Sequence, residues 1–127
     1  MQLDKIVHFE IPADNLARAK KFYSTIFGWK MNEIPEMNYV LVGTTESDEK
    51  TGVPKEPGGI NGGMLKREDP VKSVVVTISV KSIDQTAATI EKNGGKMIRA
   101  KMPVGDMGFA AYFKDPEGNV VGLWQNA

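Results

Sequence analysis

Two polar side chains on one predicted strand could carry out chemistry, and the rest of the chain offers few others. His8 is the only histidine and there is no cysteine, while Glu10 follows His8 by two residues. Residues two apart on a strand share a face, so the imidazole and the carboxylate would stand side by side. Such a pair could hydrogen-bond a small molecule or transfer a proton near neutral pH. His8 could equally be a structural histidine, or a metal ligand completed by carboxylates.

Several other functions have little support in the sequence. Without cysteine the chain has no disulfides, thiolate nucleophiles or thiolate metal sites, and it has no GxSxG or phosphate-binding glycine motif. The 16 basic residues balance 16 acidic ones, so charge gives no reason to expect nucleic acid or an anionic membrane as partner. No stretch has the apolar length of a signal peptide or a transmembrane helix. We therefore expect a cytoplasmic protein that binds neither nucleic acid nor membrane.

The strand that carries His8 opens an internal repeat. Residues 5–12, KIVHFEIP, and residues 73–82, SVVVTISVKS, alternate apolar and polar side chains and run straight into helical patterns. The first helix is predicted to begin at a capping Asp14 and to end at Gly28. The second should begin with Ser82 in a capping box and stop at two glycines, residues 94 and 95. The apolar faces of both strands should pack under these helices.

Further strands are predicted after each helix. They cover residues 37–43 and about 60–65 in the first half, and residues 108–113 and 119–125 in the second, with a type I turn at residues 115–118. The order we expect in each half is βαβββ, with one of its strands not located, within a single domain, residues 1–127. Module one covers about residues 1–66 and module two about residues 72–127. The polar loop at residues 45–59 should be mobile, either as a lid or as a solvated insertion.

These features resemble the vicinal oxygen chelate superfamily of glyoxalases, bleomycin-resistance proteins and extradiol dioxygenases. The resemblance rests on the paired βαβββ pattern, on His8 in the first strand, on FYSTIFGW at residues 22–29 and on DPEGNVVGLW at residues 115–124. It covers nearly the whole chain. It implies an α+β fold whose two βαβββ modules form a half-open β cup with the helices outside, and it implies a homodimer.

The resemblance also implies where a metal would be held, and most of those positions have lost their ligands. The family's ligands map onto His8, about Gly63, Thr77 and Gly122. Glycine has no side-chain donor and threonine is a poor ligand for a first-row ion, so His8 is the only candidate metal ligand. We therefore predict no metal site and no cofactor. A rearranged divalent-metal site that combines His8 with Glu10 or with acids of the loop is left open.

The residues of the cup's concave face are predicted to bind a small-molecule ligand instead. The two glycines would form an open floor or merely permit the strands to bend, and the aromatic residues, Phe109 among them, would form walls or pack in a core or a dimer interface. The predicted ligand-binding residues are His8, Glu10, Tyr39, Gly63, Thr77, Ser79, Tyr112, Gly122 and Trp124.

Three functions compete at this point, and whether the chain is an enzyme stays open. The first is a protein that binds or sequesters a small molecule on a glyoxalase and bleomycin-resistance fold without the family's metal. The second is a divalent-metal-dependent lyase, isomerase or dioxygenase. The third is an interaction module that pairs through its sheet edges or helix flanks. The first function predicts ligand binding, the second predicts metal-dependent turnover, and the third predicts neither.

Overall fold

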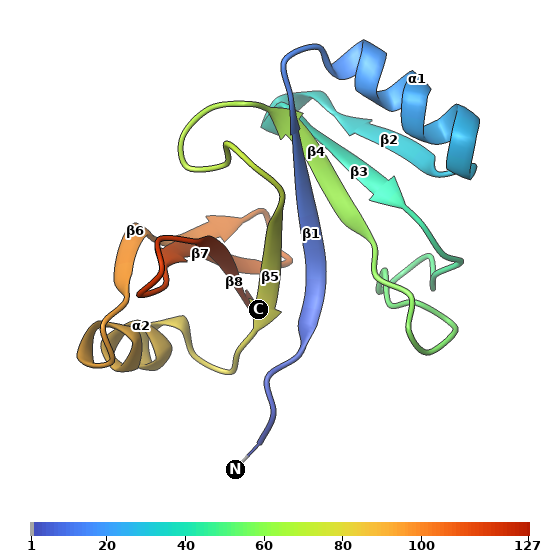
Figure 1. Cartoon of the computed structure of the whole chain (residues 1–127). Coiled ribbons are helices and arrows are strands. Elements are labelled where there is room, and N and C mark those ends of the chain that lie inside the picture. Colours follow the sequence, from blue (N-terminus) through green and yellow to red (C-terminus); the bar gives the residue numbers. More distant parts are fainter. Residues whose placement is uncertain (1) are drawn as a thin grey trace. The chain divides into compact units, whose positions relative to one another are not determined.

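The computed structural model describes residues 2–127 and confirms an α+β chain made of two βαβββ modules (Figure 1). The chain divides into two compact units, residues 8–74 and residues 2–7 together with 75–127. The elements of the first module are β1 (Ile6–Ala13), α1 (Leu16–Phe27), β2 (Lys30–Ile34), a 3₁₀ turn η1 (Pro35–Met37), β3 (Tyr39–Gly43) and β4 (Gly62–Lys66). The elements of the second are β5 (Val75–Ser79), α2 (Ile83–Lys92), β6 (Lys96–Val104), β7 (Gly108–Lys114) and β8 (Val120–Asn126).

The sheet of the first module has the strand order β2-β3-β4-β1. β1 runs parallel to β4, and the other neighbours are antiparallel. Helix α1 lies beside this sheet (Figure 1), and the apolar side chains between them form one core. Its members are the buried Val40, Val42 and Met64, with Phe9, Ile11, Leu16, Ala19, Tyr23, Trp29 and Met31 packed against them. The apolar face of β1 therefore packs under its helix as predicted, except for Val7, which is 41% exposed.

The second module repeats this arrangement with the strand order β5-β8-β7-β6. β5 is parallel to β8, and the other pairs are antiparallel. Its core contains the buried Val80, Ile83, Ala111 and Leu123, packed with Ile78, Ile90, Met97, Phe109 and Phe113. Phe109 therefore packs in the core with residues of α2. Of the two roles expected for it, this is core packing and not a wall of the ligand site.

The helix ends follow local sequence signals with one correction. Gly28 ends α1 in the left-handed conformation, and Ser82 caps α2 by accepting a hydrogen bond from the backbone N–H of residue 85. The cap of α1, however, is Asn15, whose side chain accepts from the N–H of Arg18 at 2.9 Å. Asp14 was predicted for this role but instead pairs with the Arg67 guanidinium, Nε to Oδ1, at 3.1 Å.

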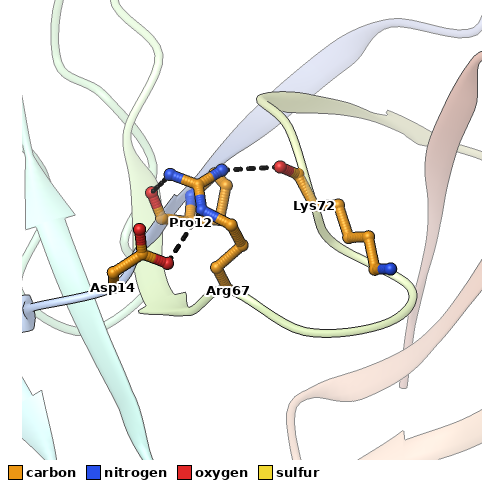
Figure 2. Close-up of polar contacts among 4 residues, drawn as sticks. All are labelled: Pro12, Asp14, Arg67 and Lys72. Atoms are coloured by element: carbon orange, nitrogen blue, oxygen red, sulfur yellow. Dashed lines mark hydrogen bonds and ion pairs between the residues drawn. The ribbon is translucent and has the colours of Figure 1, made fainter.

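Arg67 ties the end of β1 to the segment that follows β4 (Figure 2). Its guanidinium also donates to the carbonyl of Lys72 at 2.6 Å and to that of Pro12 at 3.5 Å. In the same segment Val71 is 1% exposed. The segment after β4 is thus held to the end of β1 by the side-chain hydrogen bonds of Arg67.

Polar side chains organise the loop at residues 45–59. Asn61 accepts from the N–H groups of Thr44 and Thr45, at 2.9 and 3.3 Å, and donates to the hydroxyl of Ser47 at 2.6 Å. The Asp48 carboxylate accepts hydrogen bonds from two further backbone N–H groups. Ser47 and Pro54 form an isolated antiparallel β-bridge. The loop is therefore folded on itself by hydrogen bonds. Its action as a lid stays a prediction.

Two strands were not located from the sequence, one directly after each helix. β2 is an edge strand of five residues, and β6 has register shifts against β7 between Met97 and Arg99 and between Arg99 and Met102. The predicted turn at residues 115–118 is confirmed by the Gly118 N–H, which donates to the Asp115 carbonyl at 3.0 Å. None of the helices in residues 2–127 is long and apolar enough to cross a membrane.

Candidate ligand site on the first module

β1 places His8 and Glu10 on the face of the first sheet that is turned away from α1. Phe9 and Ile11, which alternate with them, pack into the core against α1, so the two polar side chains share the opposite face. Glu10 is only 6% exposed. Burying a carboxylate is costly unless it is hydrogen-bonded, so its partners are central to the site.

Tyr39, at the start of β3, lies between the two polar residues. Its hydroxyl donates to Oε2 of Glu10 at 2.8 Å and lies 2.8 Å from Nε2 of His8. The two ring planes are 17° apart and the ring centroids are 6.3 Å apart, so the rings lie nearly end to end across this contact. His8, Tyr39 and Glu10 therefore form one hydrogen-bonded chain, which we call the polar triad.

Gly63 makes room for this arrangement. It pairs with Glu10 across the β1–β4 ladder, and an added Cβ would lie 1.8 Å from the Tyr39 hydroxyl oxygen and 2.0 Å from Cζ. No real Cβ approaches a neighbour so closely, so any side chain at this position would displace the tyrosine. The glycine floor predicted to be open at this position is covered by the Tyr39 phenol.

The environment of His8 favours its neutral form. Burial lowers the pKa of His8, and the nearby Glu10 carboxylate raises it by a smaller amount, so the net shift is downward from 6.5. A neutral imidazole in the triad has one nitrogen that donates and one that accepts. At neutral pH the triad thus contains a neutral base next to a carboxylate.

This pKa shift predicts a specific dependence of stability on pH. Because the pKa of His8 is lower in the folded chain than the unfolded value of 6.5, the unfolded state binds more protons between those two values. The free energy of unfolding should therefore fall as the pH is lowered through about 6.5. Urea unfolding of the wild type and of His8→Gln between about pH 5 and 8 measures this contribution, because the chain has no second histidine. A wild type that gains stability over His8→Gln on acidification would contradict it.

A related row of residues lies in the second module. Thr77, Gly122 and Tyr112 are directly opposite one another on β5, β8 and β7. Thr77 is 7% exposed, and a Cβ at Gly122 would lie 2.6 Å from its Oγ1. This second glycine is therefore also covered by a neighbouring side chain and does not form an open floor.

Strand register changes the correspondence between the modules. The repeat in the sequence matched Thr77 to His8. In the structure Thr77 pairs with Gly122 as Glu10 pairs with Gly63, so Thr77 corresponds to Glu10. The position in module two that matches the buried carboxylate is thus a buried hydroxyl.

Ser79 and Trp124 lie two residues beyond Thr77 and Gly122 on the same strands and are directly opposite each other. The Trp124 indole N–H donates to Oδ1 of Asn126 at 2.8 Å, and a Cβ added at Gly108 would lie 2.7 Å from Cζ2 of its ring. Ser79 lines an open cavity of about 410 Å³, together with Lys81, Asn126 and residues near the N-terminus. The structure thus places Ser79 at a cavity and Trp124 against a strand glycine.

Comparison with known proteins identifies the family. Residues 5–45 match the model of the bleomycin resistance protein-like N-terminal family. A glyoxylase-like domain-containing protein of Didymella fabae is 32% identical over 91% of this chain and 88% of its own length. The chain belongs to the vicinal oxygen chelate superfamily. Within this superfamily it is also 28% identical to the putative glyoxylase CFP32 of Mycobacterium tuberculosis over 91% of the chain, which spans 43% of that longer relative.

Solved structures of the superfamily share the fold at lower sequence identity. A methylmalonyl-CoA epimerase of Streptomyces coelicolor, in complex with 2-nitronate-propionyl-CoA, matches with a TM-score of 0.64 and 19% identity over 99% of each chain. The likeness extends over both βαβββ modules. It supports the fold and leaves the chemistry to the residues of the site.

Those residues do not fit the divalent metal of the superfamily. Gly63 and Gly122 have no side-chain donor, and Thr77, which pairs with Gly122 as Glu10 pairs with Gly63, offers only a hydroxyl, a poor ligand for a first-row ion. Over residues 2–127, no three His, Asp or Glu side chains are grouped so that they could hold a metal ion. Glu10 and His8 are bridged by a phenol hydroxyl, which is a hydrogen-bonding arrangement.

Sequence reasoning found the members of the triad but not their connection. Strand alternation pairs His8 with Glu10, whereas Tyr39 is expected as a ligand-binding wall residue or as core or dimer-interface packing. Its hydrogen bond to Glu10 spans 29 positions of the chain, and its hydrogen bond to His8 spans 31. The available signal was the glycine at position 63, because a missing Cβ permits the close approach of a large neighbour.

Proposed function

We propose that this chain is a small-molecule-binding protein of the vicinal oxygen chelate superfamily, with the polar triad of the first module as part of its ligand site. The observation that carries the proposal is the position of the Tyr39 hydroxyl, 2.8 Å from both His8 and Glu10 above a strand glycine. Three convergent polar groups on one sheet face suit recognition of an organic ligand. In this proposal hydrogen bonds, and no metal ion, hold the ligand.

The burial of the triad supports binding. A hydrogen-bonded carboxylate in a poorly solvated site interacts more strongly with a ligand than a surface carboxylate does, because less water competes. The hydrogen bonds of Tyr39 to His8 and Glu10 keep the site preorganised, which reduces the entropy lost on binding. The second-module residues Thr77, Ser79, Tyr112, Gly122 and Trp124 remain proposed as further ligand contacts.

The fold neighbours are consistent with a small organic ligand. The epimerase structure holds an acyl-CoA analogue, and another epimerase structure holds methylmalonyl-CoA itself. We carry over to this chain only the general property of binding a small molecule, because its identity to these neighbours is low. A homodimer in the cytoplasm remains part of the proposal.

The alternative is a divalent-metal-dependent lyase, isomerase or dioxygenase. The observation that favours it is the naming of the mycobacterial relative as a putative glyoxylase. The two proposals differ in a simple measurement, since only the alternative requires that added metal ions produce turnover and that chelation abolish it.

Removal of the Tyr39 hydroxyl should weaken ligand binding. We expect Tyr39→Phe to reduce affinity about tenfold, because the hydroxyl that positions His8 and Glu10 is lost while the ring is retained. The measurement is a thermal-shift screen of the wild type against a library of small polar and aromatic compounds. For each compound that binds, calorimetry then gives the affinity of the wild type and of the variant.

The matched control is Tyr23→Phe. Tyr23 belongs to the same module, but its ring packs against Trp29 in the aromatic cluster beside α1, on the other side of the sheet from the triad. Tyr23→Phe, which also removes one hydroxyl, should leave the affinity for the ligand unchanged. Equal affinities for the wild type and Tyr39→Phe would argue against the triad as the ligand site.

A further inference from the structure

The hydrogen bonds of the polar triad have a direction. An ionised carboxylate only accepts, so the single hydroxyl proton of Tyr39 is committed to Oε2 of Glu10. The 2.8 Å contact between Nε2 of His8 and the Tyr39 oxygen must then use a proton on Nε2. A neutral His8 in this arrangement carries its proton on Nε2, and Nδ1 has a lone pair.

Nδ1 of His8 is open to a ligand. Over residues 2–127 the structure gives this nitrogen no hydrogen-bond partner. No buried side-chain nitrogen or oxygen in the same residues lacks a partner, so Nδ1 must be reachable by solvent. The triad therefore presents a solvent-accessible acceptor whose other nitrogen is held by Tyr39.

We infer that the first-module site selects ligands that donate a hydrogen bond to Nδ1 of His8, as amidines, amines and hydroxyl compounds do, and that it rejects carboxylates and phosphates. The inference rests on the proposed function and names the ligand class for the same site. Glu10 gives the triad one negative charge, which attracts a cationic donor and repels an anion. A carboxylate would also place its lone pairs against that of Nδ1.

The first arm of the test needs no ligand. The ring nitrogens of the single histidine can be observed by long-range ¹H–¹⁵N correlation spectra of the full ¹⁵N-labelled chain at about pH 7.5, where a histidine of lowered pKa is neutral. We expect the shifts of a dominant Nε2–H tautomer, and a mixture of tautomers in Tyr39→Phe. A dominant Nδ1–H tautomer, or spectra that are identical in the wild type and the variant, would overturn the inference.

The second arm uses benzamidine and benzoate, which have the same ring and similar shape but opposite charge. Benzamidine should shift the His8 ring signals with an affinity about tenfold higher than that of benzoate, and Glu10→Gln should reduce this preference. Stronger or equal binding of benzoate, or no response of His8 to either probe, would overturn the inference. The proposed function has its own test. It fails if Tyr39→Phe does not weaken the binding of any compound in the library.

Discussion

Replacement of Gly63 by alanine is expected to lower the free energy of unfolding by about 2–4 kcal/mol. The added Cβ would lie 1.8 Å from the Tyr39 hydroxyl oxygen, so the ring must leave its position above the strand. Its hydrogen bonds to Glu10 and His8 would then be lost, and Glu10 is nearly buried. Urea unfolding monitored by circular dichroism measures the change.

The chain contains a matched control for this substitution. Gly43 is a strand glycine in the neighbouring β3, and a Cβ there would meet the Lys30 side chain at an ordinary 3.6 Å. Gly43→Ala should change stability by less than about 1 kcal/mol. In addition, Tyr39→Ala should remove most of the penalty of Gly63→Ala, since the two residues interact directly. A penalty that is the same with and without Tyr39 would contradict the described packing.

Replacement of Gly122 by alanine should cost about 1–3 kcal/mol for a related reason in the second module. The new Cβ would lie 2.6 Å from Oγ1 of Thr77 and 3.4 Å from its Cβ, and Thr77 is itself buried. A larger side chain, as in Gly122→Glu, should be at least as costly, because its Cβ meets the same hydroxyl.

The Thr77→Ala background tests this explanation. With the hydroxyl removed, the stability cost of Gly122→Ala should largely disappear in a double-mutant cycle measured by urea unfolding. The single variant Thr77→Ala provides the reference for the lost threonine. An unchanged cost of Gly122→Ala in that background would show that another contact limits the space at this glycine.

The repeated βαβββ pattern could be predicted because its signals are local. Alternation in β1 and β5, the glycine after α1 and the serine before α2 all act within a few residues. The edge strand β2 and the bulged β6 lack regular alternation, and pairing with a neighbour defines them instead. Such strands depend on contacts that a sequence window does not contain.

The cap of α1 shows the same limit at a single residue. Asp14 and Asn15 are both good capping residues, so local propensity does not decide between them. Asp14 is drawn into an ion pair with Arg67, 53 positions later in the chain. The cap is therefore selected by tertiary structure.

The candidate site was predictable in its residue types more than in its geometry. Strand alternation put His8 and Glu10 on one face, and the two glycines were recognised as places without side chains. The sequence does not show that Tyr39 and Thr77 cover those glycines, because that depends on strand register and rotamers. The polar triad is thus a product of three strands that meet only in the fold.

The measurement that tests the central claim most directly is the metal content of the chain. The wild type and His8→Ala would be incubated with Zn²⁺, Ni²⁺ or Mn²⁺, desalted, and analysed by elemental mass spectrometry. If the polar triad works through hydrogen bonds alone, both proteins should retain far less than about one ion per chain. A ratio near one that disappears in His8→Ala would contradict the account and establish His8 as a metal ligand.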